Sequence, residues 1–460
     1  MEPYRINFEK PNHVYFIGIG GISMSGLAEI LLNGGFQVSG SDMRESEITD
    51  HLSALGIKIV YGQKSENITD DLDCAVYTAA VHPDNPEFVS CREKKIPLLT
   101  RAELLGQIMQ QYRHSIAVSG THGKTTTTSM ITHILLAAKE NPTVSVGGML
   151  PVIGGNIRIG GKDMFVLEAC EYTNSFLSFH PTMEVILNIE ADHLDFFRDI
   201  EDIRNSFHKF VGRLPENGTV IINSGIRNYR EIVKDFRGKV VTFGLNDPHV
   251  AAENITFDAL ARPTFTLLVD GEKKDRIALH VPGEHNVKNA LAAIAAAMEL
   301  KIDPAVYEKG LSSFGGAERR FEKKGELRGI TVIDDYAHHP QEIEATLAAA
   351  LHYPHKRIVC VFQPHTYSRT KALMPEFIKA LSVADQVVLA DIYPARETDT
   401  LGVSSKDIAD GINEGGGSAV FIPSFDGIET YLLENLIPGD LCITMGAGDI
   451  YKVGERLLGK

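Results

Sequence analysis

The stretch Ser115-Ile-Ala-Val-Ser-Gly-Thr-His-Gly-Lys-Thr125 decides the fold class of this chain, because an apolar strand pattern runs directly into a glycine-rich loop. Such a loop at a helix N-terminus points several backbone N–H groups at a phosphate, and the helix dipole adds to the attraction. Lys124 can reach terminal phosphates, and the Thr125 hydroxyl can bind Mg²⁺. The standard motif has glycine where this chain has Val118, so the loop is a shortened form. The alternative, a polar turn that binds nothing, is disfavoured because Gly-Lys-Thr follows the strand so closely.

Strand and helix patterns alternate on both sides of this loop. Strands are expected at 14–17, 36–39, 165–167, 185–187, 220–222, 240–242, 265–269, 331–333, 358–362, 387–390 and 441–444, and the clearest helices at 24–33, 126–138 and 286–300. This alternation predicts parallel sheets with crossover helices. We therefore expect an α/β protein of three domains: a Rossmann-like domain at 1–106, a P-loop ATPase-type domain at 107–316 and a Rossmann-like open α/β domain at 317–460.

The composition narrows the class of protein. The chain has 460 residues, of which 43% are hydrophobic, and a net charge of −15, which argues against nucleic acid or a membrane surface as a partner. Its five cysteines form no CxxC pair, which favours reduced thiols in a cytoplasmic protein. Residues 1–12 have no signal-peptide pattern, and no apolar run is long enough to predict a membrane span.

Acidic residues follow two expected strands of the central block, where sites of α/β proteins usually lie. One cluster is Glu168-Ala-Cys-Glu-Tyr172, and the other is Asn188-Ile-Glu-Ala-Asp-His-Leu-Asp195. Solvated turn residues are the alternative for either cluster alone, but two clusters beside a phosphate loop indicate a metal site. His193 is either a metal ligand or a structural histidine, and spacing alone does not separate the two.

Two further patterns are weaker when each is taken alone. Gly18-Ile-Gly-Gly-Ile-Ser23, with Asp42 after the next strand, is compatible with NAD, with another nucleotide or with a simple tight turn. In the third block, four polar segments each follow a strand and should meet at one sheet edge, where His, Arg and Tyr side chains suit recognition of an amine and a carboxylate. These segments begin at Asp334, Phe362, Tyr393 and Gly446.

Taken in order, these motifs resemble those of the Mur ligase family over the whole chain. The matching segments are Gly18-Ile-Gly-Gly21, Gly120-Thr-His-Gly-Lys-Thr125, Asn188-Ile-Glu-Ala-Asp-His193, Pro282-Gly-Glu-His-Asn286, Arg319-Arg-Phe321 and Asp335-Tyr-Ala-His-His-Pro340. The resemblance implies an ADP-forming ligase of peptidoglycan synthesis whose small-molecule partners are UDP-N-acetylmuramic acid, ATP and L-alanine. It also implies two Mg²⁺ ions, for which Mn²⁺ can substitute, and a monomer or weak homodimer.

The resemblance assigns residues to four groups. The UDP-sugar contacts would be Gly18, Gly20, Gly21, Asp42, Thr78, Ala79 and Ala80; the ATP contacts Gly120, Thr121, His122, Gly123, Lys124, Thr125, Thr126, Asn286, Asn289 and Arg320; the amino-acid contacts Tyr336, His338 and Arg369; and the metal ligands Thr125, Glu171 and His193. Lys124, Glu171, His193, His338 and Arg369 would be the catalytic set.

Two departures and three rivals qualify this assignment. Many relatives carry Asp-Glu-Ser where this chain has Cys170-Glu-Tyr172. Some relatives also carry Arg where this chain has Thr366, so Arg369 is the residue expected to bind the amino-acid carboxylate. The nearest rival is a sister enzyme that attaches a whole peptide to the same sugar nucleotide. An NAD-dependent oxidoreductase would leave the phosphate loop unused, and an NTP-driven switch would leave the third block without a role.

Overall fold

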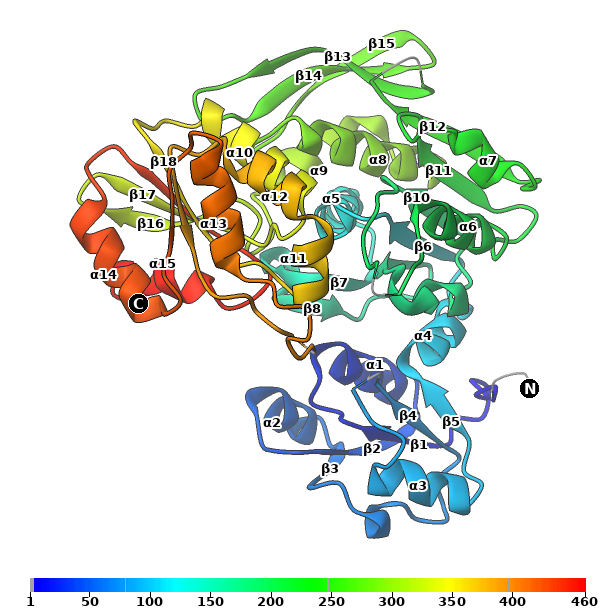
Figure 1. Ribbon diagram of the computed structural model, residues 1–460. Helices are drawn as coiled ribbons and strands as arrows, with labels where there is room; N and C mark the ends of the chain where they lie inside the picture. Colours follow the sequence, from blue (N-terminus) through cyan, green and yellow to red (C-terminus); the bar gives the residue numbers. More distant parts are fainter. Residues whose placement is uncertain (1–3, 79, 195, 246–247, 396) are drawn as a thin grey trace.

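Three α/β bodies follow one another along the chain in the computed structural model, which describes residues 4–78, 80–194, 196–245, 248–395 and 397–460 (Figure 1). Each has its own sheet, and the order of strands shows no exchange between bodies. The expected α/β class with three domains is confirmed. In the part of the chain that is described, no helix is both long and apolar enough to cross a bilayer.

The N-terminal body is a five-stranded parallel sheet in the order β3-β2-β1-β4-β5. Its apolar strands are buried by helices on both faces, as a doubly wound sheet requires. The strands are β1 His13–Ile17, β2 Gln37–Asp42, β3 Lys58–Tyr61, β4 Cys74–Tyr77 and β5 Leu98–Thr100, and the helices are α1 Ile22–Asn33, α2 Glu47–Ala54, α3 Pro86–Glu93 and α4 Arg101–Met109. The boundary expected at residue 106 lies inside α4.

The central body has a ten-stranded sheet in the order β15-β14-β13-β12-β11-β10-β6-β9-β7-β8. Its strands are β6 His114–Ser119, β7 Thr143–Leu150, β8 Gly155–Arg158, β9 Met164–Ala169, β10 Met183–Ile186, β11 Thr219–Asn223, β12 Lys239–Gly244, β13 Val250–Phe257, β14 Pro263–Val269 and β15 Glu272–Ala278. Its α-helices are α5 Lys124–Ala137, α6 Ile200–Val211, α7 Tyr229–Val233, α8 His285–Glu299 and α9 Tyr307–Ser313. The strands beside the phosphate loop are parallel, and antiparallel strands close both edges.

The phosphate-loop helix α5 is buried along nearly its whole length. It packs against α8, whose face is a run of buried alanines, so the two helix backbones approach closely. A helix that is buried to this extent cannot move without disturbing the core of the central body. The packing of α5 therefore fixes the position of the phosphate loop that precedes it.

The C-terminal body has a six-stranded sheet in the order β16-β17-β21-β18-β19-β20, with only β16 antiparallel. The strands are β16 Glu322–Leu327, β17 Ile330–Asp335, β18 Ile358–Phe362, β19 Gln386–Leu389, β20 Ala419–Phe421 and β21 Leu441–Met445, and the helices are α10 Pro340–His352, α11 Tyr367–Ala372, α12 Met374–Leu381, α13 Ser405–Glu414, α14 Phe425–Asn435 and α15 Tyr451–Leu457.

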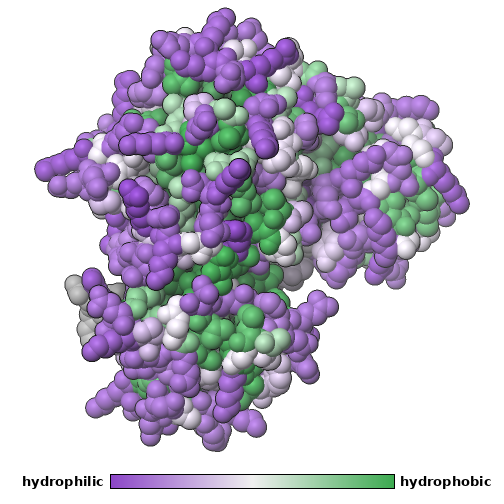
Figure 2. Space-filling model, turned by 180° about the vertical axis from the view of Figure 1, so that it is seen from behind, coloured by the Kyte–Doolittle hydropathy of each residue, from purple (hydrophilic) through white to green (hydrophobic). Residues whose placement is uncertain are grey.

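Two glycines mark where the N-terminal body meets the central one. A Cβ on Gly26 of α1 would lie 1.5 Å from Ile157 of β8, and one on Gly106 of α4 would lie 1.9 Å from the backbone oxygen of Ser178. Figure 2 shows apolar residues across this junction, between the lower lobe and the body above it, while polar residues cover most of the remaining surface. The first domain is thus closely packed on the second.

Candidate active site

The phosphate loop joins β6 to α5 and depends on two glycines. Gly120 has φ +130° and Gly123 has φ +83°, conformations that other residues rarely adopt. A Cβ on Gly123 would also lie 2.7 Å from Asn289 Oδ1. The loop is braced by the segment after β10, because Asn188 Oδ1 accepts the His122 N–H at 2.8 Å and Asn188 Nδ2 donates to the His122 carbonyl at 3.0 Å. The geometry is that of a backbone cradle.

Lys124 begins α5 and turns back over this cradle. Its Nζ donates to the Gly120 carbonyl and, at 3.0 Å, to the Thr121 carbonyl, and it lies 3.3 Å from Glu171 Oε2. Burial alone would lower the pKa of Lys124, but Glu171, together with Cys170 and Glu168, outweighs it, and the pKa is raised. Lys124 is therefore a fixed positive charge at the loop.

The residues around Lys124 fit a magnesium ion that is shared with a phosphate. Glu171 is buried, and Glu168 accepts the Gly147 N–H at 2.6 Å. Burial raises the pKa of Glu168, although the Gly147 N–H and the Thr125 hydroxyl oppose this. Among the described residues no three His, Cys, Asp or Glu side chains are grouped as a complete metal site. Mg²⁺ commonly takes only one or two carboxylates and completes its shell with phosphate and water, so this oxygen-rich set is suitable.

A cavity of about 630 Å³ opens beside the loop. Six of the ten residues assigned to ATP line it: His122, Gly123, Thr126, Asn286, Asn289 and Arg320. The other four, Gly120, Thr121, Lys124 and Thr125, belong to the loop and the first turn of α5. Asn286 and Asn289 lie on one face of α8 and are joined by a hydrogen bond of 3.0 Å. Asn188, Asp335 and Glu342 also line this cavity.

A second cavity of about 390 Å³ lies between the central and C-terminal bodies. Asp192 and His193 line it from one side, and His365 and Arg369 from the other. His193, with φ +53°, stacks on Tyr172 at 4.5 Å between ring centroids. Burial lowers the pKa of His193, although Asp192 opposes this, so His193 is a neutral imidazole suited to binding a cation.

The remaining two amino-acid contacts, Tyr336 and His338, are not among the residues that line this second cavity, but His338 lies beside His365, which does line it. The Tyr336 ring packs against the guanidinium groups of Arg319 and Arg320, at 4.9 and 5.1 Å from its centroid. The His338 ring lies 5.5 Å from that of Tyr336 and 5.6 Å from that of His365. The four polar segments that follow β17, β18, β19 and β21 do lie at one sheet edge, as their positions after parallel strands predict.

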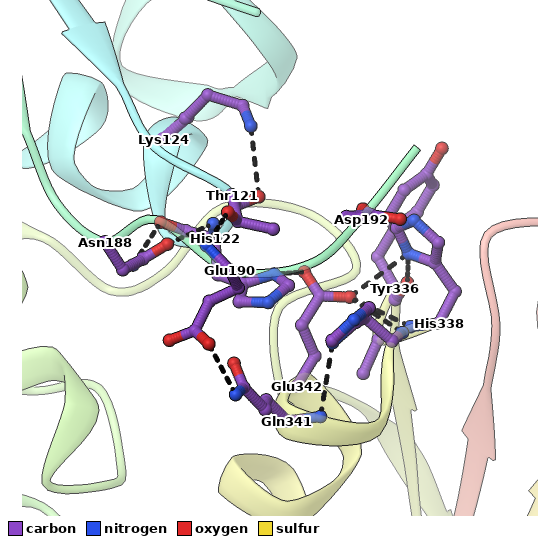
Figure 3. Close-up of polar contacts among 12 residues, drawn as sticks. Thr121, His122, Lys124, Asn188, Glu190, Asp192, Tyr336, His338, Gln341 and Glu342 are labelled. Atoms are coloured by element: carbon purple, nitrogen blue, oxygen red, sulfur yellow. Dashed lines mark hydrogen bonds and ion pairs between the residues drawn. The ribbon is translucent and has the colours of Figure 1, made fainter. Parts of the chain in front are cut away.

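Side-chain contacts connect the central body with the C-terminal body (Figure 3). Gln341 Nε2 donates to Glu190 Oε2 at 2.7 Å, and His122 Nδ1 lies 3.2 Å from Glu342 Oε1. The Arg369 guanidinium lies 3.0 Å from Asp192 Oδ1. Sequence reasoning did not find Glu342, because its contact with His122 joins residues 220 positions apart.

The glycine turn of the N-terminal body is built around Asp42. Gly18 has φ +81°, and the Gly20 N–H donates to Asp42 Oδ2 at 2.8 Å. Gly21 precedes α1, so N–H groups of the first turn point toward the same sheet edge. Thr78 follows β4 at this edge, and its hydroxyl accepts the Ala80 N–H at 3.1 Å. Ala79, the remaining residue assigned to the UDP-sugar, lies outside the described residues.

Arg101 is a second residue that sequence reasoning did not find. It follows β5 at the same sheet edge, as the first residue of α4. Burial lowers the pKa of Arg101, while the neighbouring Cys170 thiol opposes this, so its side chain reaches the segment that carries Glu171. No hydrogen bond or ion pair joins its guanidinium to any residue in the described ranges. A largely buried cation that has no partner among the described residues is suited to binding an anion. The only signal in the sequence is its position directly after a strand.

Three models of one family match the chain from near its beginning to near its end. They are the catalytic domain of the Mur ligase family at residues 13–113, the Mur ligase middle domain at 118–297, and the glutamate ligase domain of Mur ligases at 319–448. The three matches follow the three sheets. The chain belongs to the Mur ligase family, and it is a ligase with the three-domain architecture of that family.

Particular members of the family are similar over their full length. The UDP-N-acetylmuramate–L-alanine ligases of Lachnospira eligens and Agathobacter rectalis are 60% and 57% identical, and each match covers 99% of this chain and 100% of the relative. The crystal structure of UDP-N-acetylmuramate–alanine ligase from Thermotoga maritima superposes with a TM-score of 0.79 at 32% identity, covering 97% of this chain and 98% of that one. A murein peptide ligase from Psychrobacter arcticus follows with a TM-score of 0.69 at 25% identity, covering 97% and 98%.

Proposed function

We propose that the protein catalyses ATP-dependent ligation of L-alanine to the carboxylate of UDP-N-acetylmuramic acid, through an acyl phosphate and with release of ADP and phosphate. The observation that carries the proposal is a wall shared by the two cavities. Residues 187–190 line the cavity beside the phosphate loop, and residues 191–194 line the cavity beside Arg369. Adjoining cavities suit a reaction that first passes a phosphoryl group and then an acyl group over a short distance.

The first step activates a carboxylate, which is by itself a poor acyl donor. Transfer of the terminal phosphoryl group of ATP to a carboxylate oxygen forms an acyl phosphate, whose phosphate leaves readily. Two anions must approach each other, and Lys124 together with the N–H groups at the start of α5 offsets their repulsion. Thr125, Glu171 and His193 would hold Mg²⁺, which supplies further compensation of charge.

The second step is attack by the amine of L-alanine on the acyl carbon, with expulsion of phosphate. The amine must attack as the free base, because an ammonium group has no lone pair. Arg369 lines the second cavity and would bind the amino-acid carboxylate, while His338, which lies beside the lining residue His365, and the neighbouring Tyr336 would lie close to the amine. This side of the protein thus offers one cationic group for the carboxylate and aromatic rings beside the amine.

The N-terminal body would hold the sugar nucleotide. The turn Gly18–Gly21 and the start of α1 would present backbone N–H groups to a diphosphate, and Asp42, the last residue of β2, stands where a ribose hydroxyl can be bound. Arg101 supplies a cation on the side that faces Cys170 and the phosphate loop. The carboxylate to be activated would therefore extend from the first domain toward Lys124.

Water must be excluded, because the acyl phosphate would otherwise hydrolyse. The contacts of Asp192, Glu190 and His122 with the C-terminal body supply this closure. ATP and the sugar nucleotide are cytoplasmic metabolites, so the reaction would take place in the cytoplasm, catalysed by a monomer or weak homodimer.

The test is ADP release with ATP, Mg²⁺ and UDP-N-acetylmuramic acid, with each of the twenty amino acids added in turn. We expect release that depends on L-alanine, and its loss in Lys124→Ala but not in Lys139→Ala, which alters a lysine just after the far end of the same helix. Release only with a peptide that begins with L-alanine would transfer the assignment to a peptide ligase. Release that ignores the amine would contradict the proposal.

A further inference from the structure

Glu342 is a buried carboxylate at the junction of the two cavities. It lies in the first turn of α10, and only 13% of its side chain is exposed. One oxygen, Oε1, lies 3.2 Å from His122 Nδ1 in the phosphate loop, and the other, Oε2, lies 3.2 Å from His338 Nδ1. Figure 3 shows the carboxylate between the two imidazole rings, which come from different domains.

The partners of Glu342 determine which nitrogen of each histidine carries hydrogen. An ionised carboxylate only accepts hydrogen bonds, so Nδ1 of both rings must be the donor. For His338 a second partner leads to the same result, because Nδ1 also lies 3.0 Å from the Tyr336 carbonyl, which is likewise only an acceptor. Burial would raise the pKa of Glu342, but the positive charge that His338 and His122 carry when protonated, together with the hydrogen bonds from their side chains, holds that pKa well below the ordinary value, so the carboxylate is ionised.

The opposite nitrogen of each ring is thereby left for other partners. His122 Nε2 is buried and has no partner among the described residues, although His122 lines the cavity beside the phosphate loop. The His338 ring faces His365, a residue that lines the second cavity. One carboxylate thus connects the two places where the proposed phosphoryl and acyl transfers occur.

We propose that Glu342 is a positioning residue that fixes His122 and His338 in the Nδ1–H form, so that His338 presents an unprotonated Nε2 to the incoming amine. The role assigned to His338 rests on the proposed function. The ammonium group of the amino acid gives one proton to Nε2, which leaves a neutral amine and an imidazolium whose charge Glu342 balances. The amine then attacks the acyl carbon, the C–O bond to phosphate breaks, and the second proton leaves with the phosphate.

A structural role for Glu342 also exists and must be separated from this one. Glu342 accepts the N–H of His338 at 3.0 Å and of His339 at 3.3 Å, which forms a capping box at the start of α10. Glutamine fills this capping position as well as glutamate does. Glu342→Gln therefore keeps the cap, but it places an amide nitrogen, a donor, against one of the two histidines.

The experiment compares Glu342→Gln with Glu344→Gln, a partly exposed glutamate two residues further along α10. We expect Glu342→Gln to lower kcat about 100-fold, the size of a lost acid–base contribution, with the melting temperature unchanged. We expect Glu344→Gln to behave as the wild type. A wild-type kcat in Glu342→Gln, or a loss of activity that follows a loss of stability, would overturn the proposal.

A second measurement does not depend on turnover. Long-range proton–nitrogen spectra of the full chain labelled with ¹⁵N-histidine report the tautomer of each ring, and His122→Asn and His338→Asn identify the two signals. We expect both rings in the Nδ1–H form, and one of them to change in Glu342→Gln. Rings found in the Nε2–H form in the wild type would contradict the inference. ADP release by the wild type that does not depend on L-alanine would contradict only the proposed function.

Discussion

Asp192 of the central domain and Arg369 of the C-terminal domain form an ion pair 3.0 Å long, with only 8% and 9% of their side chains exposed. Burial would raise the pKa of Asp192, but the Arg369 guanidinium and neighbouring histidines outweigh it, and that pKa lies well below its ordinary value. Arg369 is also the residue expected to bind the amino-acid carboxylate. The residue that closes the two domains in this structure is therefore the one that the substrate would engage.

Asp192→Asn should open the molecule. Removal of the carboxylate leaves a buried guanidinium without its counter-charge, which costs about 3 kcal/mol. Small-angle scattering should then show a larger radius of gyration than the wild type gives. Because the folded pKa is lowered, the ion pair stabilises closure above the ordinary aspartate pKa and is lost only as the pH falls through the lowered value. The wild-type radius should accordingly be the same at pH 8 and pH 5, and expansion at pH 5 would contradict the assignment.

Glu171→Gln should raise the Mg²⁺ concentration that gives half-maximal ligation. The amide loses the charge that faces Lys124 and the ion, and one charged ligand contributes a large share of the affinity for a hard cation. A magnesium titration of ADP release measures the change, with Glu201→Gln on the exposed face of α6 as the control. An identical titration curve in the two variants would remove Glu171 from the metal shell.

Arg101→Ala should raise the KM for the sugar nucleotide by about tenfold or more, because a charge-assisted contact in a mostly buried site is lost. The KM for ATP should stay within about twofold, and Arg92→Ala, at the exposed end of α3, should change neither. The affinities of the variant for UDP and for UDP-N-acetylmuramic acid show which group Arg101 contacts. If both affinities fall equally, Arg101 contacts the diphosphate. If only the affinity for UDP-N-acetylmuramic acid falls, Arg101 contacts the carboxylate. Unchanged binding of both would exclude Arg101 from the site.

Glu184 of β10 should make the protein less stable as the pH rises. Its side chain is completely buried, Oε2 has no partner among the described residues, and burial raises its pKa well above the ordinary value. A carboxyl with a raised folded pKa holds its proton in the folded state and releases it on unfolding. Stability is therefore lost above about pH 4.5, by up to about 1.4 kcal/mol per pH unit until the folded pKa is reached.

Urea unfolding of Glu184→Met at pH 5, 6, 7 and 8 tests this prediction. The variant should gain stability over the wild type progressively toward pH 8, because it has no proton to lose. The exposed Glu216→Met should show a constant difference from the wild type across the same range. A constant difference for Glu184→Met would mean that the carboxyl titrates normally.

The parts of the fold that could be predicted are those with a strong local pattern. The apolar runs around Val166 and Val185 indicated buried parallel strands, and their acidic ends do meet the phosphate loop. The edge strands β15 and β16 were not predicted, because both are rich in charged residues and show no run of apolar residues, and β15 is also mostly exposed. Edge strands are recognised by their neighbours in the sheet, which one sequence does not reveal.

The candidate site likewise has features that could be predicted from the sequence and features that could not. The turn of the glycine loop and the place of Lys124 at the start of a helix could be predicted because both depend on adjacent residues. The contacts of Glu342 with His122 and of Arg369 with Asp192 join residues far apart in the chain, and no motif encodes the distance between two domains. The roles assigned to the individual residues stay predictions until the variants above are measured.

The close approach of Gly106 to Ser178 means that the connection between the first and second domains is stiffer than the connection between the second and third. A rotation of α4 would drive its backbone into that of the segment after Glu171, so the joint between the first two domains resists bending. The other joint passes through Gly315, which has open space around it, and Gly316, with φ +112°. Freedom of rotation is therefore concentrated at one point. A compound bound beside Gly315 would therefore restrict the movement of the third domain.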